Sequence, residues 1–266
     1  MLMSKEQIAF LRKKKTKKII IIVSQLVLTL SFLLLWQCLS DQKIINPFIF
    51  SSPKKIVETI FSLYQNYNLI THILTTVFET IIAFTLGISL GFMIAVLLYE
   101  LPLLQKILDP FLTMLNSLPK VALGPIIIIW CGANTNSIIV MALLINLIIS
   151  IITIYNGFLN TDNYKIKLLK SFKATKFQIL SKVVIPESFK TIIASFKINI
   201  SLSLIGCISG EFLVSRKGIG YLIIYGTQIF NLNIVMSGII ILILISFILY
   251  ECIDKLEKYL LKKISG

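Results

Sequence analysis

"SFKATKFQILSKVVIPES", residues 171–188, is a lysine-rich amphipathic stretch that separates two long apolar runs of this chain. Thr175 and Gln178 form a T-x-x-Q pattern, which is typical of a capping box at the first turn of a helix. Pro186 disfavours helical backbone in the residue before it. The sequence therefore predicts a short capped helix over residues 176–185.

Apolar residues recur at helical spacing on both sides of this cap. They are Ile166, Leu169 and Phe172 before it, and Phe177, Leu180 and Val184 after it. Lys173 and Ala174 lie between the two sets, so two short helices are expected to meet at a corner there. We call residues 165–186 the elbow. Its lysines would also suit a simpler role, that of holding a loop against anionic lipid.

The composition of the whole chain indicates an integral membrane protein. Of its 266 residues 56% are hydrophobic and 14% are charged, against about 25% charged in a soluble domain, and the mean hydropathy is +0.90. Apolar runs long enough to span a bilayer lie near 19–38, 76–99, 109–131, 137–158, 191–214 and 234–252. The expected fold is all-α, a polytopic membrane protein with six transmembrane helices.

The net charge of +14 is best explained by anchoring of loops on one side of the membrane, and not by nucleic-acid binding. With a cytoplasmic N-terminus, 19 basic residues fall in inside segments and five in outside segments. This asymmetry predicts a multi-pass protein of the cell membrane with both termini in the cytoplasm, and it puts the elbow there too.

The predicted organisation follows from this topology. The segments are a basic cytoplasmic N-terminus (1–18), a first transmembrane anchor (19–38), an outer-face amphipathic segment (39–67), a transmembrane domain (68–254) with a cytoplasmic loop (159–190), and a cytoplasmic tail (255–266). In the outer segment Ile56, Ile60, Phe61 and Tyr64 follow Pro53 at helical spacing, which predicts an amphipathic helix.

Small residues and prolines interrupt two of the predicted spans. Ala83, Gly87, Gly91 and Ala95 recur every fourth residue, a stripe on which another helix can pack closely. Pro119 and Pro125 break the third span around Lys120, and a broken helix is tolerated at membrane depth where it lines a cavity or packs in protein. A kinked packing helix with Lys120 reaching the interface is the alternative.

Enzymatic motifs are absent from the sequence. There is one histidine and no H-E-x-x-H, and "GISLG" (87–91) lies inside an apolar run and not in the strand-turn-helix setting of a nucleophile elbow. No G-x-x-x-x-G-K-[ST] pattern exists to hold nucleotide phosphates, and the four cysteines show no metal-binding spacing. The chain is expected to have no ATPase site, cofactor or metal of its own.

"SFKATKFQILSKVVIP" (171–186) resembles the cytoplasmic coupling-loop motif of ATP-binding-cassette importer permeases, although Lys173 stands at its usual glycine and Lys167 to Leu169 replace its EAA. "NSLPKVALGPIIIIWCG" (116–132) and "ISGEFLVSRKGIGYLIIYGTQIFNLNIVM" (208–236) look like the nitrate, sulfonate and taurine branch of that family. The resemblance extends over about residues 50 to 254 and implies a type I importer transmembrane domain.

The resemblance also implies partners and residue roles. The partners would be a cytoplasmic ATPase subunit that binds the ATP, an extracytoplasmic solute-binding protein, the lipid bilayer and a second copy of the chain. The solute would be a sulfonate, nitrate, taurine or a related compound such as a thiamine-precursor pyrimidine. The residues expected to couple to the ATPase are Leu169, Phe172, Lys173, Ala174, Thr175, Phe177, Gln178, Leu180 and Pro186.

Candidates for the translocation path are Asn116, Lys120, Asn199 and Glu211. A charge such as Glu211 at the end of a span indicates function, and the alternative is an ion pair with Arg216 or Lys217 near the outer surface. Lys197 is expected to reach toward the cytoplasm. Two other classes remain open at this point: a secondary transporter driven by an ion gradient, and a membrane-embedded enzyme.

Overall fold

The computed structural model describes residues 5–265, and the predicted all-α fold is confirmed over this range. The helices are α1 (Lys5–Asp41), α2 (Pro47–Phe50), α3 (Pro53–Asn66), α4 (Leu69–Glu100), α5 (Pro102–Ser117), η1 (Lys120–Leu123), α6 (Gly124–Cys131), α7 (Thr135–Leu159), α8 (Asn163–Ser171), α9 (Lys176–Ile179), η2 (Leu180–Val184), α10 (Ile185–Val214), α11 (Ile219–Gln228) and α12 (Leu232–Ser265).

Within residues 5–265, five stretches of helix are long and apolar enough to cross a membrane, and there are six if one bent pair is counted as a span. The five are Lys13–Asp41, Leu69–Glu100, Thr135–Leu159, Lys176–Val214 and Leu232–Lys263. The bent pair is the predicted third span, in which Pro102–Ser117 and Lys120–Cys131 meet at 91°. Pro119 lies at the bend, whereas Pro125 lies in the first turn of α6, where the missing N–H of proline is tolerated.

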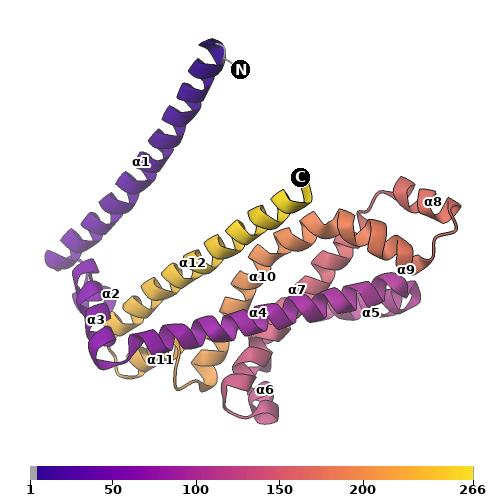
Figure 1. Ribbon diagram of the computed structural model, residues 1–266. Helices are drawn as coiled ribbons and strands as arrows, with labels where there is room; N and C mark the ends of the chain where they lie inside the picture. Colours follow the sequence, from indigo (N-terminus) through magenta and orange to yellow (C-terminus); the bar gives the residue numbers. More distant parts are fainter. Residues whose placement is uncertain (1–4, 266) are drawn as a thin grey trace.

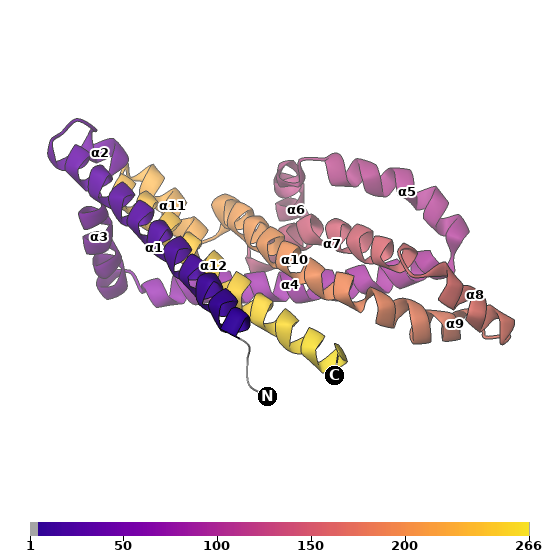
Figure 2. The same cartoon turned by 90° about the horizontal axis from the view of Figure 1, so that it is seen from above.

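The helices α4, α7 and α10 form the centre of the molecule, because α7 packs along both of the others (Figure 1). The C-terminal helix α12 runs beside α10 and α11. The first helix, α1, contacts mainly α2 and α3, and Figure 1 shows the rest of it standing apart from the bundle, while Figure 2 shows α5 and α8 at the opposite end from α2.

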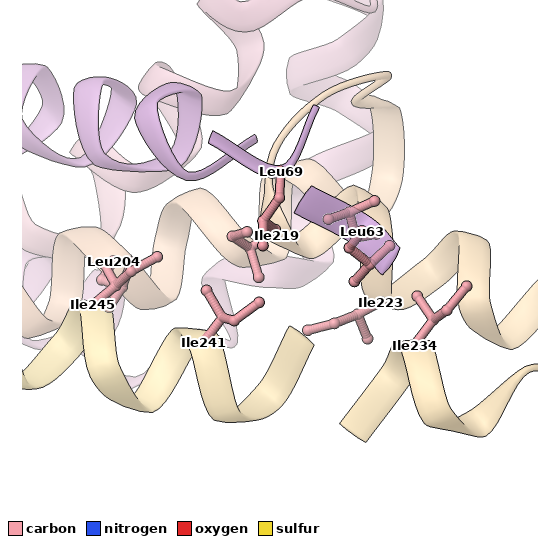
Figure 3. Packing of buried hydrophobic residues seen from close by; sticks show 9 residues of the cluster. Leu63, Leu69, Leu204, Ile219, Ile223, Ile234, Ile241 and Ile245 are labelled. Atoms are coloured by element: carbon pink, nitrogen blue, oxygen red, sulfur yellow. The ribbon is translucent and has the colours of Figure 1, made fainter. Parts of the chain in front are cut away.

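An apolar cluster joins five helices at the α3 end of the bundle (Figure 3). Its buried members are Leu63, Leu69, Leu204, Ile219, Leu222, Ile223, Ile234, Ile241 and Ile245. The cluster fixes α3 against the bundle through Leu63, and Ile56, about two turns earlier on the same helix, is also buried.

The predicted amphipathic helix over residues 53–66 is present, with Ser52 as its cap and Pro53 at its first position. The residues assigned to its apolar face were partly wrong. Ile56 and Ile60 turn toward the bundle, but Phe61 and Tyr64 are exposed, because Leu63 completes the buried face instead.

The prediction that the capped helix ends near Ile185 is wrong. Helix continues without a break from Lys176 to Val214, and Pro186 lies inside it. A π-helical turn over Leu180–Val184 precedes the proline. Such a turn widens the backbone and shifts its hydrogen bonds by one residue, so the proline ring and its missing N–H are accommodated within one continuous helix.

Candidate functional site

The corner of the elbow is a helix C-terminus closed by its own backbone. After α8, the N–H of Ala174 donates to the carbonyl of Leu169 at 3.0 Å, and the N–H of Lys173 donates to the carbonyl of Lys170 at 2.9 Å. These two bonds form a Schellman motif, in which the first residue after the C-cap of the helix adopts the left-handed conformation. Lys173 occupies that position with φ of 56°.

The predicted capping box is present on the other side of the corner. The Thr175 hydroxyl accepts from the backbone N–H of Gln178 at 3.3 Å, and the Gln178 side chain accepts from the backbone N–H of Thr175 at 2.8 Å. Two reciprocal bonds satisfy donors that the helix itself leaves free. The C-terminus of α8 and the N-terminus of α9 are therefore both capped by local hydrogen bonds, only a few residues apart.

A lysine in the left-handed region is strained, so Lys173→Gly is expected to stabilise the elbow by about 1 kcal/mol. Thermal unfolding of the purified chain should show a midpoint raised by a few degrees. Lys170→Gly is the matched control, because Lys170 lies inside α8, where glycine costs about 1 kcal/mol. A lower midpoint for Lys173→Gly would contradict the strained geometry.

The apolar residues of the elbow divide into an inner and an outer set. Leu180 and Val184 are buried, and Leu169 and Ala174 pack against the same cluster, which also contains Phe158. Phe172 and Phe177, by contrast, are 73% and 72% exposed. The expectation that Phe177, Leu180 and Val184 share one face is therefore wrong at Phe177, since the bundle covers only the inner side of this helix.

The remaining predicted coupling residues lie close to the corner. Thr175 and Gln178 are exposed apart from their mutual bonds, and Pro186 is exposed at the start of α10. The elbow thus presents two large aromatic side chains and several lysines on a backbone that is fixed by local hydrogen bonds.

The four candidates for the translocation path are not brought together. Asn116 is exposed at the end of α5, and the Lys120 ammonium donates to the backbone carbonyl of Asn116 at 3.0 Å. Asn199 and Glu211 are instead fully buried in the bundle.

Asn199 belongs to a row of polar contacts between α4, α7 and α10. Its side-chain oxygen accepts from the Ser150 hydroxyl at 2.9 Å. Asn146, one turn earlier on α7, donates to the carbonyl of Ala83 at 2.9 Å and to the Ser203 hydroxyl at 2.5 Å. These bonds join all three central helices.

The small-residue stripe lies on the α4 side of this row, and all four of its members are buried. A Cβ on Gly87 would overlap the Asn146 side chain, and a Cβ on Gly91 would meet Ser150. The stripe therefore leaves room for the polar side chains of α7, while Ala83 and Ala95 pack in apolar clusters on either side.

Glu211 caps the first turn of α11. One carboxylate oxygen accepts from the Thr76 hydroxyl at 2.6 Å, and the other accepts from the backbone N–H of Gly220 at 2.5 Å. Thr76 also accepts from the N–H of Ile219 at 2.9 Å, and the ring Nδ1 of His72 accepts from the N–H of Gly218 at 3.0 Å. Side chains from α4 and α10 thus satisfy three donors of this turn, which are otherwise free at a helix N-terminus.

The alternative pairing of Glu211 with Arg216 or Lys217 is not formed, because both of its oxygens are engaged by Thr76 and Gly220. Glycine is needed beside this carboxylate, since a Cβ on Gly218 or Gly220 would overlap it, and Gly218 has φ of +104°. The glycines of this loop are explained by close approach and backbone conformation.

Two further charged groups were not predicted to matter in this way. Glu79 of α4 is 0% exposed, and neither of its carboxyl oxygens has a hydrogen-bond partner among the described residues. In the sequence, the sign of this residue's importance was that Glu79 lies inside an apolar run. Lys197 reaches toward the C-terminal end of α12, where its ammonium pairs with Asp254 at 2.5 Å and Glu257 at 2.9 Å and so joins α10 to α12.

Comparison with known proteins gives a consistent result. The profile of the family described as "Binding-protein-dependent transport system inner membrane component" matches residues 87–266. A probable ABC transporter permease protein of Haemophilus influenzae is 28% identical over 84% of this chain and 90% of its own length. A putative aliphatic sulfonates transport permease protein of Bacillus subtilis is 27% identical over 94% and 91%, respectively.

A similar solved fold comes from the MetNI methionine ABC transporter in an inward-facing conformation. That chain aligns with a TM-score of 0.63 at 17% identity, over 72% of this chain and 95% of its own length. At this identity the likeness concerns the fold.

Proposed function

This chain belongs to the binding-protein-dependent transport system inner membrane components, the permease subunits of ATP-binding-cassette importers, and from that premise we propose that its elbow docks a cytoplasmic ATPase subunit. The permease spans the membrane and has no ATPase site of its own. In this proposal both termini and the elbow face the cytoplasm, two copies of the chain form the pathway, and an extracytoplasmic binding protein delivers the solute.

The exposure of Phe172 and Phe177 is the observation that carries this proposal. Large aromatic side chains, Phe among them, are enriched in protein interfaces relative to the rest of the surface. Here they stand on a corner closed by backbone bonds and by a capping box, so little conformational entropy is lost when a partner binds. Lipid binding through the lysines alone would not require this rigidity.

The proposed solute is a small sulfonate. The basic residues of the elbow do not bear on the choice of solute. The support for a sulfonate comes from the aliphatic sulfonates permease, which matches nearly the whole chain. Taurine, nitrate and a thiamine-precursor pyrimidine are the further solutes to include in a ligand screen with the purified complex and its binding protein.

The docking proposal is tested by the double variant Phe172→Ala, Phe177→Ala. Both side chains are exposed, so the free energy of unfolding of the isolated chain should change by less than about 0.5 kcal/mol. Loss of two aromatic anchors should cost about 2 kcal/mol or more of binding energy, which is roughly 30-fold in affinity for the ATPase. The measurement is co-purification with the ATPase, together with solute uptake in matched membranes.

Lys165→Gln is the control, because Lys165 makes an exposed ion pair with Glu187 at 3.2 Å that contributes little. If the double variant retains the ATPase and normal uptake, while removal of several lysines detaches the chain from anionic liposomes, the elbow is a lipid anchor and the docking proposal fails.

A further inference from the structure

A cavity of about 340 Å³ lies beside the elbow, and its lining includes neither Phe172 nor Phe177. Its polar lining consists of Tyr99 and Glu100 at the end of α4, Tyr155 of α7, Lys170 of α8 and Lys176 of α9. The helices α4, α7, α8 and α9 therefore place one carboxylate, two ammonium groups and two phenols around one space.

The charged groups of this cavity do not neutralise one another. The Oε1 atom of Glu100 is buried and has no hydrogen-bond partner within residues 5–265. None of the ion pairs in that range joins Glu100 to Lys170 or Lys176. A buried carboxylate oxygen without a donor is costly, so a ligand that offers a cationic donor to Glu100 and an anion to the lysines would be stabilised here.

The remainder of the lining is apolar and leads to an apolar helix face. Leu159, Ile166 and Ile179 form part of the wall. Pro102, also in the wall, begins α5, whose exposed side chains include Leu103 and Ile107. In a membrane protein such a face lies against lipid tails, so a molecule with a zwitterionic head and hydrocarbon chains fits both parts of the surface.

We propose that this cavity binds the headgroup of an aminophospholipid, with its primary ammonium at Glu100 and its phosphate at Lys170 and Lys176. A primary ammonium donates hydrogen bonds to a carboxylate, whereas the quaternary ammonium of a choline headgroup cannot. A purely anionic headgroup would satisfy the lysines and leave Glu100 without a donor. The site uses Lys170 and Lys176 of the elbow but neither Phe172 nor Phe177, and it does not depend on ATPase binding.

The test uses the full purified chain in lipid nanodiscs. Addition of phosphatidylethanolamine to phosphatidylcholine discs should raise the thermal midpoint by several degrees, and native mass spectrometry should detect retained phosphatidylethanolamine. Glu100→Gln should abolish the difference between the two lipids, because the amide lacks the charge that selects the ammonium. Lys170→Gln with Lys176→Gln should weaken retention of both lipids at least tenfold.

Lys167→Gln is the matched control, since Lys167 is an exposed lysine of α8 outside the lining. Glu100→Asp, which keeps the charge, should restore part of the lipid preference, and this separates a binding role from a folding defect. Soluble O-phosphoethanolamine, which lacks the hydrocarbon chains, shows whether the site binds the lipid or only a free headgroup.

Three results would overturn the assignment. They are equal stabilisation by phosphatidylethanolamine and phosphatidylcholine, a preference unchanged by Glu100→Gln, and stabilisation by O-phosphoethanolamine without any effect of the lipid. Neither the ATPase nor the binding protein is in the experiment, so its failure would leave the proposed transport function untouched.

Discussion

Gly87→Leu is expected to prevent the chain from accumulating as a folded membrane protein. A Cβ at this position already overlaps the Asn146 side chain, and leucine adds three more carbons at the contact between α4 and α7. Overpacking of a core costs about 1–3 kcal/mol and sometimes more. Displacement of Asn146 would also break its bonds to Ala83 and Ser203, at about 1–3 kcal/mol for each buried group left unpaired.

The measurement is the yield of monodisperse protein after detergent extraction, with thermal unfolding of whatever is recovered. Ser89→Leu is the control, because Ser89 is exposed two residues away on the same helix and should accept leucine without loss. Gly87→Ala should fall between the two, since its single Cβ displaces Asn146 less. A Gly87→Leu protein that extracts and melts like the wild type would show that this interface is not tightly packed.

The second large effect is expected at the cap of α11. Glu211→Ala removes the acceptor for the Thr76 hydroxyl and for the N–H of Gly220, both in a buried setting. Two unsatisfied buried groups should lower the free energy of unfolding by about 3 kcal/mol. Glu211→Gln should cost less, because its amide keeps one oxygen as an acceptor.

Hydrogen exchange at the amides of Ile219 and Gly220 provides a local readout of the same change. Exchange there should accelerate in Glu211→Ala, and it should remain slow in Arg216→Ala, because Arg216 is exposed and makes no bond to Glu211. Equal destabilisation by Arg216→Ala would point to a surface ion pair in place of the buried cap.

Local chemistry made parts of the elbow predictable. The capping box of Thr175 and Gln178 uses partners three residues apart, so the sequence contains everything it requires. The proline rule failed at Pro186 because a π-helical turn solves the same steric problem, and no residue pattern announces such a turn.

Burial within an apolar stripe was less predictable. Phe177 and Leu180 lie three residues apart and on neighbouring sides of one helix, yet one is exposed and the other buried. The difference arises from where the bundle ends, which depends on α7 and not on the spacing. Lys197 is a similar case, because its partners Asp254 and Glu257 lie on another helix, 57 and 60 residues further along the chain.

The two buried acids show the limit most clearly. Glu79 and Glu211 both follow apolar residues in long helices, and only the fold distinguishes a carboxylate held by Thr76 and Gly220 from one without a partner. The donors for Glu211 come from Thr76 of α4, 135 residues earlier, and from Gly220 in the first turn of α11, nine residues later. Such pairings follow from helix packing.

The unbroken helix from Lys176 to Val214 connects the elbow to the opposite end of the bundle. Its 39 residues have a length of about 58 Å along the helix, at about 1.5 Å per residue. If this helix tilted as a rigid body by about 5° at its capped end, the opposite end would move by roughly 5 Å at most. Glu211 lies near that end and is bonded to Thr76 and Gly220, so α4 and α11 would move with it. A push on the elbow would therefore reach α4 and α11 at the far end of the bundle through one continuous helix.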